Sequence, residues 1–172
     1  MAVDLTLSVR ALLAESTALD LGTAVMTHLF EFPGALGTGN YTTGTTDNKQ
    51  DRVWSDSRSL VATSEQLDLR GVLQSALGGN LDFIEVRGIL IKNKATAAAS
   101  VLLVGGGANP AFAGLFAATG DIIKVPASGC LLWFAPLDGG GLATTGGTAD
   151  MLTIDSGAAT IAYDIVVWGV SA

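Results

Sequence analysis

The side chains that could act as a nucleophile, a general base or a soft metal ligand are few in this chain. There is one histidine, His28, in the segment THLFEF, and one cysteine, Cys130, in the apolar segment GCLLWF. Nucleophilic catalysis needs a base held beside the nucleophile, and no G-x-S-x-G turn accompanies His28. A transition-metal site would depend on carboxylates, which is unusual. We therefore expect His28 at a surface or interface and Cys130 as a small buried hydrophobe.

Carboxylates are plentiful but scattered along the chain. Asp82 and Glu85 are three residues apart, which places them on opposite faces of a strand. The segment Gly105–Asn109, GGGAN, lacks the Lys-Ser/Thr pair of a phosphate-binding loop, so we interpret it as a tight turn. A loop calcium site at Asp121 or Asp138 is left open. We predict no catalytic, cofactor-binding or metal-binding residues and no enzymatic activity.

The composition is typical of a folded chain with an acidic surface. The chain has 172 residues, 49% apolar and 15% charged, which is enough for one domain with a sizeable core. Its net charge of −7 disfavours binding to nucleic acid, which needs a basic face. Its apolar runs are far shorter than the roughly 20 residues of a membrane-spanning helix. We therefore expect neither nucleic acid nor a membrane as a partner.

The stretch Leu81–Lys94, LDFIEVRGILIKNK, lies near the middle of the chain and would form the central strand. It alternates in residue type and then becomes continuously apolar, as in a strand that passes from half-buried to fully buried. Gly88 within it indicates a bulge or a close backbone approach. The three tryptophans, Trp54, Trp133 and Trp168, also lie in strand patterns, which favours packing in a core or interface.

The first 50 residues fall into two parts that differ in composition. Alternating residues predict strands at Asp4–Leu13, Ser16–Val25 and Thr27–Phe32, with one amphipathic helix over residues 9–25 as the alternative. Residues 34–50 (Gly34–Gln50) are rich in Gly, Thr and Asn, which predicts a loop or flexible arm.

About ten short strands separated by glycine-rich turns are expected in all. The pattern predicts an all-β fold: an antiparallel β-sandwich, jelly-roll-like, with extra N-terminal strands. Residues 1–172 would form a single β-sandwich domain that contains the 34–50 segment. An immunoglobulin-like sandwich is the alternative, although the Cys…Trp…Cys spacing is missing.

An ordered series of short segments resembles a family of small β-rich virion proteins of tailed bacteriophages, encoded close to the major capsid protein. The resemblance covers roughly residues 51–170. The matching segments are Asp51–Leu60 (DRVWSDSRSL), Leu67–Leu69 (LDL), Ile91–Lys94 (IKNK), Val104–Gly106 (VGG), Asn109–Phe116 (NPAFAGLF), Gly147–Asp150 (GTAD) and Tyr163–Val167 (YDIVV).

The resemblance implies a capsid decoration or cement protein that binds the major capsid protein and stabilises the shell. It implies a homotrimer on the capsid surface of the virion, assembled in the host cytoplasm, and no catalytic residues. High apolar content with few charges suits a protein that buries further surface between subunits. A glycan-binding adhesin module on a virion surface is the alternative function.

Overall fold

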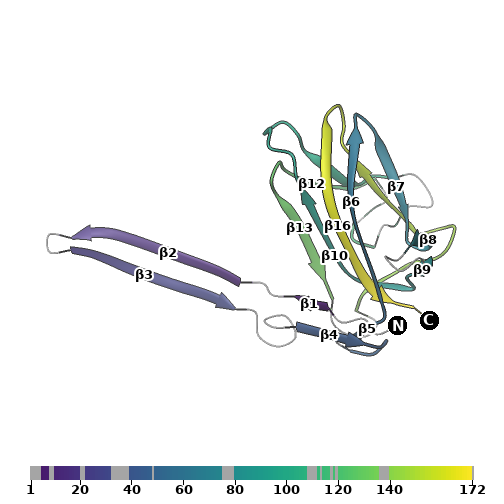
Figure 1. The fold of residues 1–172 in the computed structure, drawn as a ribbon, viewed down its shortest axis with the longest axis horizontal. Helices are drawn as coiled ribbons and strands as arrows, with labels where there is room; N and C mark the ends of the chain where they lie inside the picture. Colours follow the sequence, from purple (N-terminus) through teal and green to yellow (C-terminus); the bar gives the residue numbers. More distant parts are fainter. Residues whose placement is uncertain are drawn as a thin grey trace.

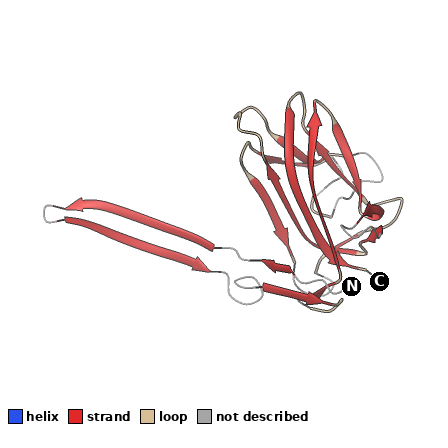
Figure 2. Cartoon of the chain, viewed as in Figure 1, coloured by secondary structure: helices blue, strands red, loops and turns tan. Residues whose placement is uncertain are grey.

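The structure is a computed structural model. It describes residues 5–7, 10–19, 22–31, 39–47, 49–74, 80–107, 112, 114–116, 118, 120–135 and 140–171, with side chains from residue 44 onward. All regular secondary structure in these residues is β-strand, as predicted (Figure 2).

Eight principal strands and the short β14 form the two sheets of a β-sandwich (Figure 1). The strands of the first sheet, in spatial order, are β13 (Cys130–Phe134), β10 (Glu85–Asn93), β16 (Thr160–Val170) and β6 (Arg52–Val61), with the short β14 (Leu142–Ala143) also beside β10. The strands of the second sheet are β12 (Ile122–Val125), β11 (Leu102–Gly105), β15 (Met151–Asp155) and β7 (Ser64–Asp68). Neighbouring strands in both sheets are antiparallel.

The strand pairs are nested, and this confirms the jelly-roll prediction. The innermost pair is β11 with β12, and it is enclosed in sequence by β10 with β13, then β7 with β15, then β6 with β16. A long antiparallel ribbon folded in this way, and then rolled so that successive pairs alternate between sheets, is the jelly roll of eight strands. The order differs from that of the immunoglobulin-like alternative.

Alternating residues of the two sheets fill the space between them. On β16, Ile161, Tyr163, Ile165 and Val167 are each 0–1% exposed. They belong to the same buried cluster as inward-facing residues of the second sheet, which are Leu102, Val104, Leu152 and Ile154. The period-2 pattern seen in the sequence is therefore the alternation between core and outer face.

The stretch Leu81–Lys94 is central, as predicted. It contains the end of β9 (Asn80–Asp82) and all of β10, which lies between β13 and β16. Gly88 has both features expected of it: the register shifts between Val86 and Gly88, and the indole of Trp168 lies where a Cβ of residue 88 would be. Strand β9 pairs with β8 (Arg70–Gln74) in a small separate sheet.

The N-terminal strands lie outside the two sheets of the sandwich. Strands β2 (Arg10–Leu19) and β3 (Gly22–Glu31) pair in register over their full length and form a hairpin, which we call the arm. Figure 1 shows the arm projecting away from the sandwich. Extended strands over 10–19 and 22–25 show that the helical alternative for residues 9–25 is wrong there.

The 34–50 segment, predicted to be a loop or arm, contains strands where the structure describes it. Strand β4 (Gly39–Thr43) pairs with β1 (Leu5–Leu7) and, in parallel, with β5 (Lys49–Gln50). The loop prediction is therefore wrong for residues 39–43 and 49–50. Tyr and Thr favour strands, and this preference outweighed the glycine-rich composition. Residues 34–38 and 48 lie outside the described residues.

Candidate interaction surfaces

The first sheet has an apolar outer face, turned away from the core. Because Ile89 and Ile91 point inward and are 0% exposed, Leu90 between them points outward. Its partners across the sheet, Leu132 and Val166, therefore point outward as well. We define the outer apolar face by Val53, Leu90, Leu132, Phe134, Val166 and Trp168.

The side chains of this face differ in exposure: one end is fully buried and the rest is partly exposed. Trp168 is 1% exposed and its indole lies across Gly88, whereas Val53, Leu90, Leu132, Phe134 and Val166 are half-buried. Half-buried apolar side chains grouped on one sheet face are typical of an interaction surface.

Charged and polar side chains border the outer apolar face at the other end of the sheet. Lys94 Nζ lies 3.0 Å from Asp164 Oδ1, and Ser57 Oγ donates a hydrogen bond of 2.7 Å to the same oxygen. These two contacts, Ser57 first, hold the pKa of the Asp164 carboxyl below its ordinary value. This exposed border is therefore hydrophilic near neutral pH.

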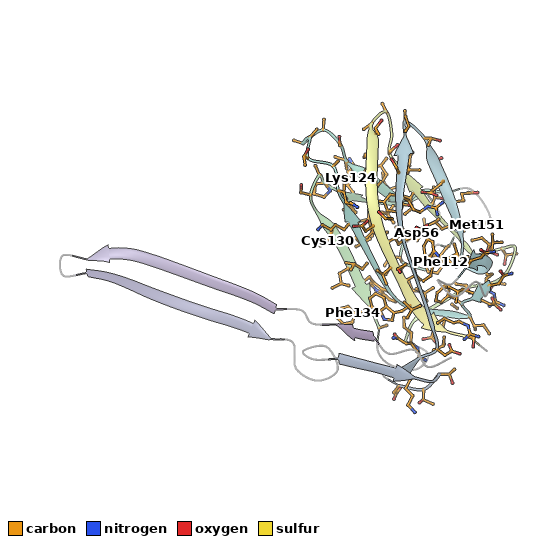
Figure 3. The ribbon with its side chains drawn as sticks, in the orientation of Figure 1. Asp56, Phe112, Lys124, Cys130, Phe134 and Met151 are labelled. Atoms are coloured by element: carbon orange, nitrogen blue, oxygen red, sulfur yellow. The ribbon has the colours of Figure 1, made fainter. Side chains whose placement is uncertain are left out.

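Cys130 also lies on the outer side of this sheet, and the prediction of a buried cysteine is wrong. It pairs with the exposed Lys92 at the start of β13 and is itself exposed. Figure 3 shows Cys130 and Phe134 on β13. The run GCLLWF has no alternation that distinguishes its two faces, so only the pairing with β10 determines where the thiol points.

Arg87 joins the N-terminal segment to the sandwich. Its side chain is completely buried beside the bulge in β10. Nη1 donates to the carbonyl oxygens of Thr46 at 2.6 Å and Lys49 at 2.7 Å, and Nη2 donates to the carbonyl oxygen of Thr45 at 2.8 Å. Nε lies 3.3 Å from Glu85 Oε1. Arg87 thus fixes the turn from which β4 leads back toward the arm.

A polar cluster connects the two sheets along one open edge of the sandwich. Arg58 of β6 contacts Glu65 of β7 through Nε at 2.7 Å and Nη2 at 2.5 Å. Tyr163 donates a hydrogen bond of 2.6 Å to Glu65 Oε1, and Asp56 lies 2.8 Å from Arg58 Nη1. Burial and then the bond to Glu65 raise the pKa of Tyr163, so its hydroxyl is a neutral donor and not a base.

Two hollows are open to solvent beside β7. One, of about 390 Å³, is lined by residues of β6, β7 and β8 that include Trp54, Asp56 and Arg58. The other, of about 280 Å³, lies on the outer face of the second sheet and includes Gln66, Thr153 and Asp155. Neither lining contains histidine or cysteine, so neither offers a nucleophile paired with an imidazole base.

Three of the four acidic residues singled out from the sequence, Asp82, Glu85 and Asp121, have structural partners. Asp82 Oδ1 lies 2.8 Å from Arg70 Nε, while Glu85 accepts the backbone N–H of Gly141 at 2.8 Å and pairs with Arg87. Asp121 accepts the N–H of Ala118 at 2.9 Å. Within the described residues, no three His, Cys, Asp or Glu side chains are grouped closely enough to hold a metal ion.

The structure describes only part of the remaining predicted features, which are the 105–109 turn, Asp138 and His28. Gly105 and Gly106 have φ of +100° and +74°, which agrees with the tight turn, while residues 108–109 lie outside the described residues. Asp138 also lies outside them. The backbone of His28 is in β3 of the arm, and its side chain is not described.

Arg87 is the residue that the sequence reasoning missed. The available signal was a charged residue immediately before the glycine and the apolar run Ile89–Ile91 of the central strand. A buried charge of this kind needs partners, and its partners are backbone carbonyls about 40 residues away in sequence.

Comparison of the chain with protein-family models, with curated proteins and with solved structures found no match. In the part of the chain that the structure describes, no helix is long and apolar enough to cross a bilayer. Inferences about function therefore depend on the strand order and the surfaces described above.

Proposed function

We propose that this protein is a structural component of a tailed-bacteriophage virion, a decoration protein that binds the major capsid protein and stabilises the shell. The observation that carries the proposal is the nested strand order from β6 to β16, because viral capsid proteins are among the main users of the jelly roll. The segments that resemble small virion proteins cover the same region of the chain. In this proposal the protein acts as a homotrimer on the capsid surface.

The outer apolar face supports a role in assembly. A monomer that works alone has little use for apolar side chains grouped on one sheet face, whereas a subunit buries them against a neighbour. The polar border of Lys94 and Asp164 beside this face resembles the hydrophilic rim of an interface.

Glycan binding is the alternative, because lectins also use the jelly roll. Sugar rings stack on exposed aromatic faces, but Trp54, which lines the larger hollow, is only 5% exposed. We therefore prefer the decoration role.

The test is to mix the purified protein with empty shells of the major capsid protein. We expect saturable co-sedimentation, and shells that withstand heating and low salt better than undecorated ones. Shells that neither bind the protein nor gain stability would overturn the proposal, and a positive glycan-array result would then favour the adhesin alternative.

A further inference from the structure

The arm is a hairpin whose strands have further pairing capacity. Within the described residues, β2 and β3 pair only with each other. A two-stranded hairpin alone in water is marginally stable, and each strand has an outer edge of unpaired N–H and C=O groups. Eleven of its twenty strand residues are apolar, six in β2 and five in β3. Such a hairpin gains stability by adding to another sheet.

Strand β13 is the least protected sheet edge of the sandwich. Of the four edge strands, β6 carries Arg52, Asp56 and Arg58, β7 carries Glu65 and Asp68, and β12 carries Lys124 and is followed by Pro126. Charges and proline are the usual devices that prevent edge-to-edge pairing. Strand β13, with the sequence CLLWF, carries no charge, and the nearest proline after it, Pro136, lies two residues beyond its end.

We propose that the arm of one copy of this chain adds to the β13 edge of a second copy and extends its first sheet. Addition of an extended segment to a sheet edge is a recurring mode of recognition, in which backbone hydrogen bonds supply affinity. The ten-residue strands of the arm are about 33 Å long, against about 17 Å for β13, so one arm strand covers the whole edge.

Two observations favour a second copy as the partner. Arg87 fixes the base of the 45–49 turn to its own sandwich, and Figure 1 shows the arm pointing away from that sandwich. The charges are also complementary. Residues 10–31 carry Arg10 against Glu15, Asp20 and Glu31, while Lys92, on the neighbouring strand β10, lies directly opposite Cys130 of β13.

The first experiment separates the two halves of the proposed contact. Leu132→Lys places a charge on β13, and Met26→Pro removes a backbone donor from β3. We expect the wild-type protein to scatter light as an oligomer and each variant as a monomer whose sandwich still unfolds cooperatively in urea. An equimolar mixture should contain particles of two chains, because the intact arm of one variant can add to the intact edge of the other.

Leu132→Gln, which makes the position polar without adding a charge, should retain more of the oligomer than Leu132→Lys. A monomeric wild-type protein would overturn the proposal, as would variants that assemble like the wild type or a mixture that stays monomeric. Leu132 also belongs to the outer apolar face, so the Leu132→Lys variant alone does not distinguish the two contacts. Rescue in the mixture does, because it requires an intact arm on one chain and an intact edge on the other, and it needs no capsid.

The second experiment does not depend on disrupting any strand. Cys130 is the only cysteine in the sequence, so a second cysteine is introduced in turn at each position of β2 and β3, and the same cysteine in a Cys130→Ser background identifies any crosslink between two introduced cysteines. We expect disulfide-linked dimers on non-reducing gels at alternate positions of one arm strand, and protection of Cys130 from maleimide in the oligomer. The control is Lys124→Cys, which places the second cysteine on β12, at the edge of the other sheet and outside the arm. Crosslinks only within a chain, or at no arm position, would overturn the proposal.

Discussion

The indole of Trp168 lies across Gly88 on the outer side of the first sheet. The two residues are paired between β16 and β10, and a Cβ added at position 88 would overlap the indole ring. The bulge at Arg87 immediately precedes this contact. One glycine therefore lets the strand carry a large aromatic side chain flat against its backbone while the preceding residue turns toward the N-terminal segment.

Gly88→Ala is expected to lower the free energy of unfolding by about 1–3 kcal/mol, because the new methyl group must displace the ring. Urea unfolding monitored by tryptophan fluorescence measures the change. Gly146→Ala is the matched control, since nothing lies within 4 Å of a Cβ at that position. In a Trp168→Val background the cost of Gly88→Ala should shrink, and equal costs in both backgrounds would contradict the contact.

Arg87→Met is expected to destabilise the protein by about 3–5 kcal/mol, because it removes one partner of a buried ion pair and the donor to three carbonyls. Arg87→Lys should recover only part of the loss, since an ammonium group lacks the fork of donors. Lys94→Met, which removes an exposed pair, should cost less than about 1 kcal/mol.

Proteolysis offers a more local measurement of the same variants. With Arg87 replaced, a protease should cleave the 45–49 turn faster than in the wild type under conditions where the sandwich remains folded. Equal cleavage rates in Arg87→Met and wild type would show that Arg87 does not hold this turn.

The sandwich could be predicted from the sequence because its signal is local. Tyr163, Ile165 and Val167 alternate with outward residues, and β15 shows the same alternation. The orientation of Cys130 could not be predicted, because β13 is apolar on both faces and only its register with Lys92 turns the thiol outward.

The contact between Arg87 and the 45–49 turn was also inaccessible to local reasoning. Its hydrogen bonds join residues about 40 positions apart, and they are accepted by backbone carbonyls of the turn, which no side-chain pattern in the sequence indicates. The outer apolar face was hidden for a similar reason. Leu90, Leu132 and Val166 become neighbours only through strand pairing.

Asn93→Asp tests a buried polar link between the two sheets. Asn93 is 0% exposed, and its Nδ2 donates to the carbonyl oxygens of Ser100 at 2.8 Å and Val125 at 3.0 Å. A carboxylate has the same shape but cannot donate when ionised, so two buried carbonyls would face a negative charge. We expect a loss of about 3 kcal/mol or more in urea unfolding at pH 7.

The loss from Asn93→Asp should become smaller as the pH falls and the new carboxyl is protonated. Asn80→Asp, at an exposed position of β9, is the control and should change stability by less than about 0.5 kcal/mol. A pH-independent loss in Asn93→Asp would mean that the charge is not its cause.

Tyr163 should make the stability of the protein fall at alkaline pH. Its pKa is raised by burial and by the hydrogen bond to Glu65. An unfolded tyrosine ionises near pH 10, so above about pH 10 the unfolded chain releases a proton that the folded chain keeps. The contribution is therefore fully present below the unfolded pKa and is lost as the pH rises toward the folded pKa.

Tyr163→Phe removes this titration together with the hydrogen bond to Glu65. We expect a loss of about 1.5–3 kcal/mol at pH 7, because the bond is made to a carboxylate. The difference between wild type and variant should narrow above pH 10, measured by urea unfolding from pH 7 to 11. Lysine titration affects both proteins alike and cancels in the difference. A difference that stays constant over this range would show that Tyr163 ionises equally in the folded and unfolded chains, contrary to its buried contact with Glu65.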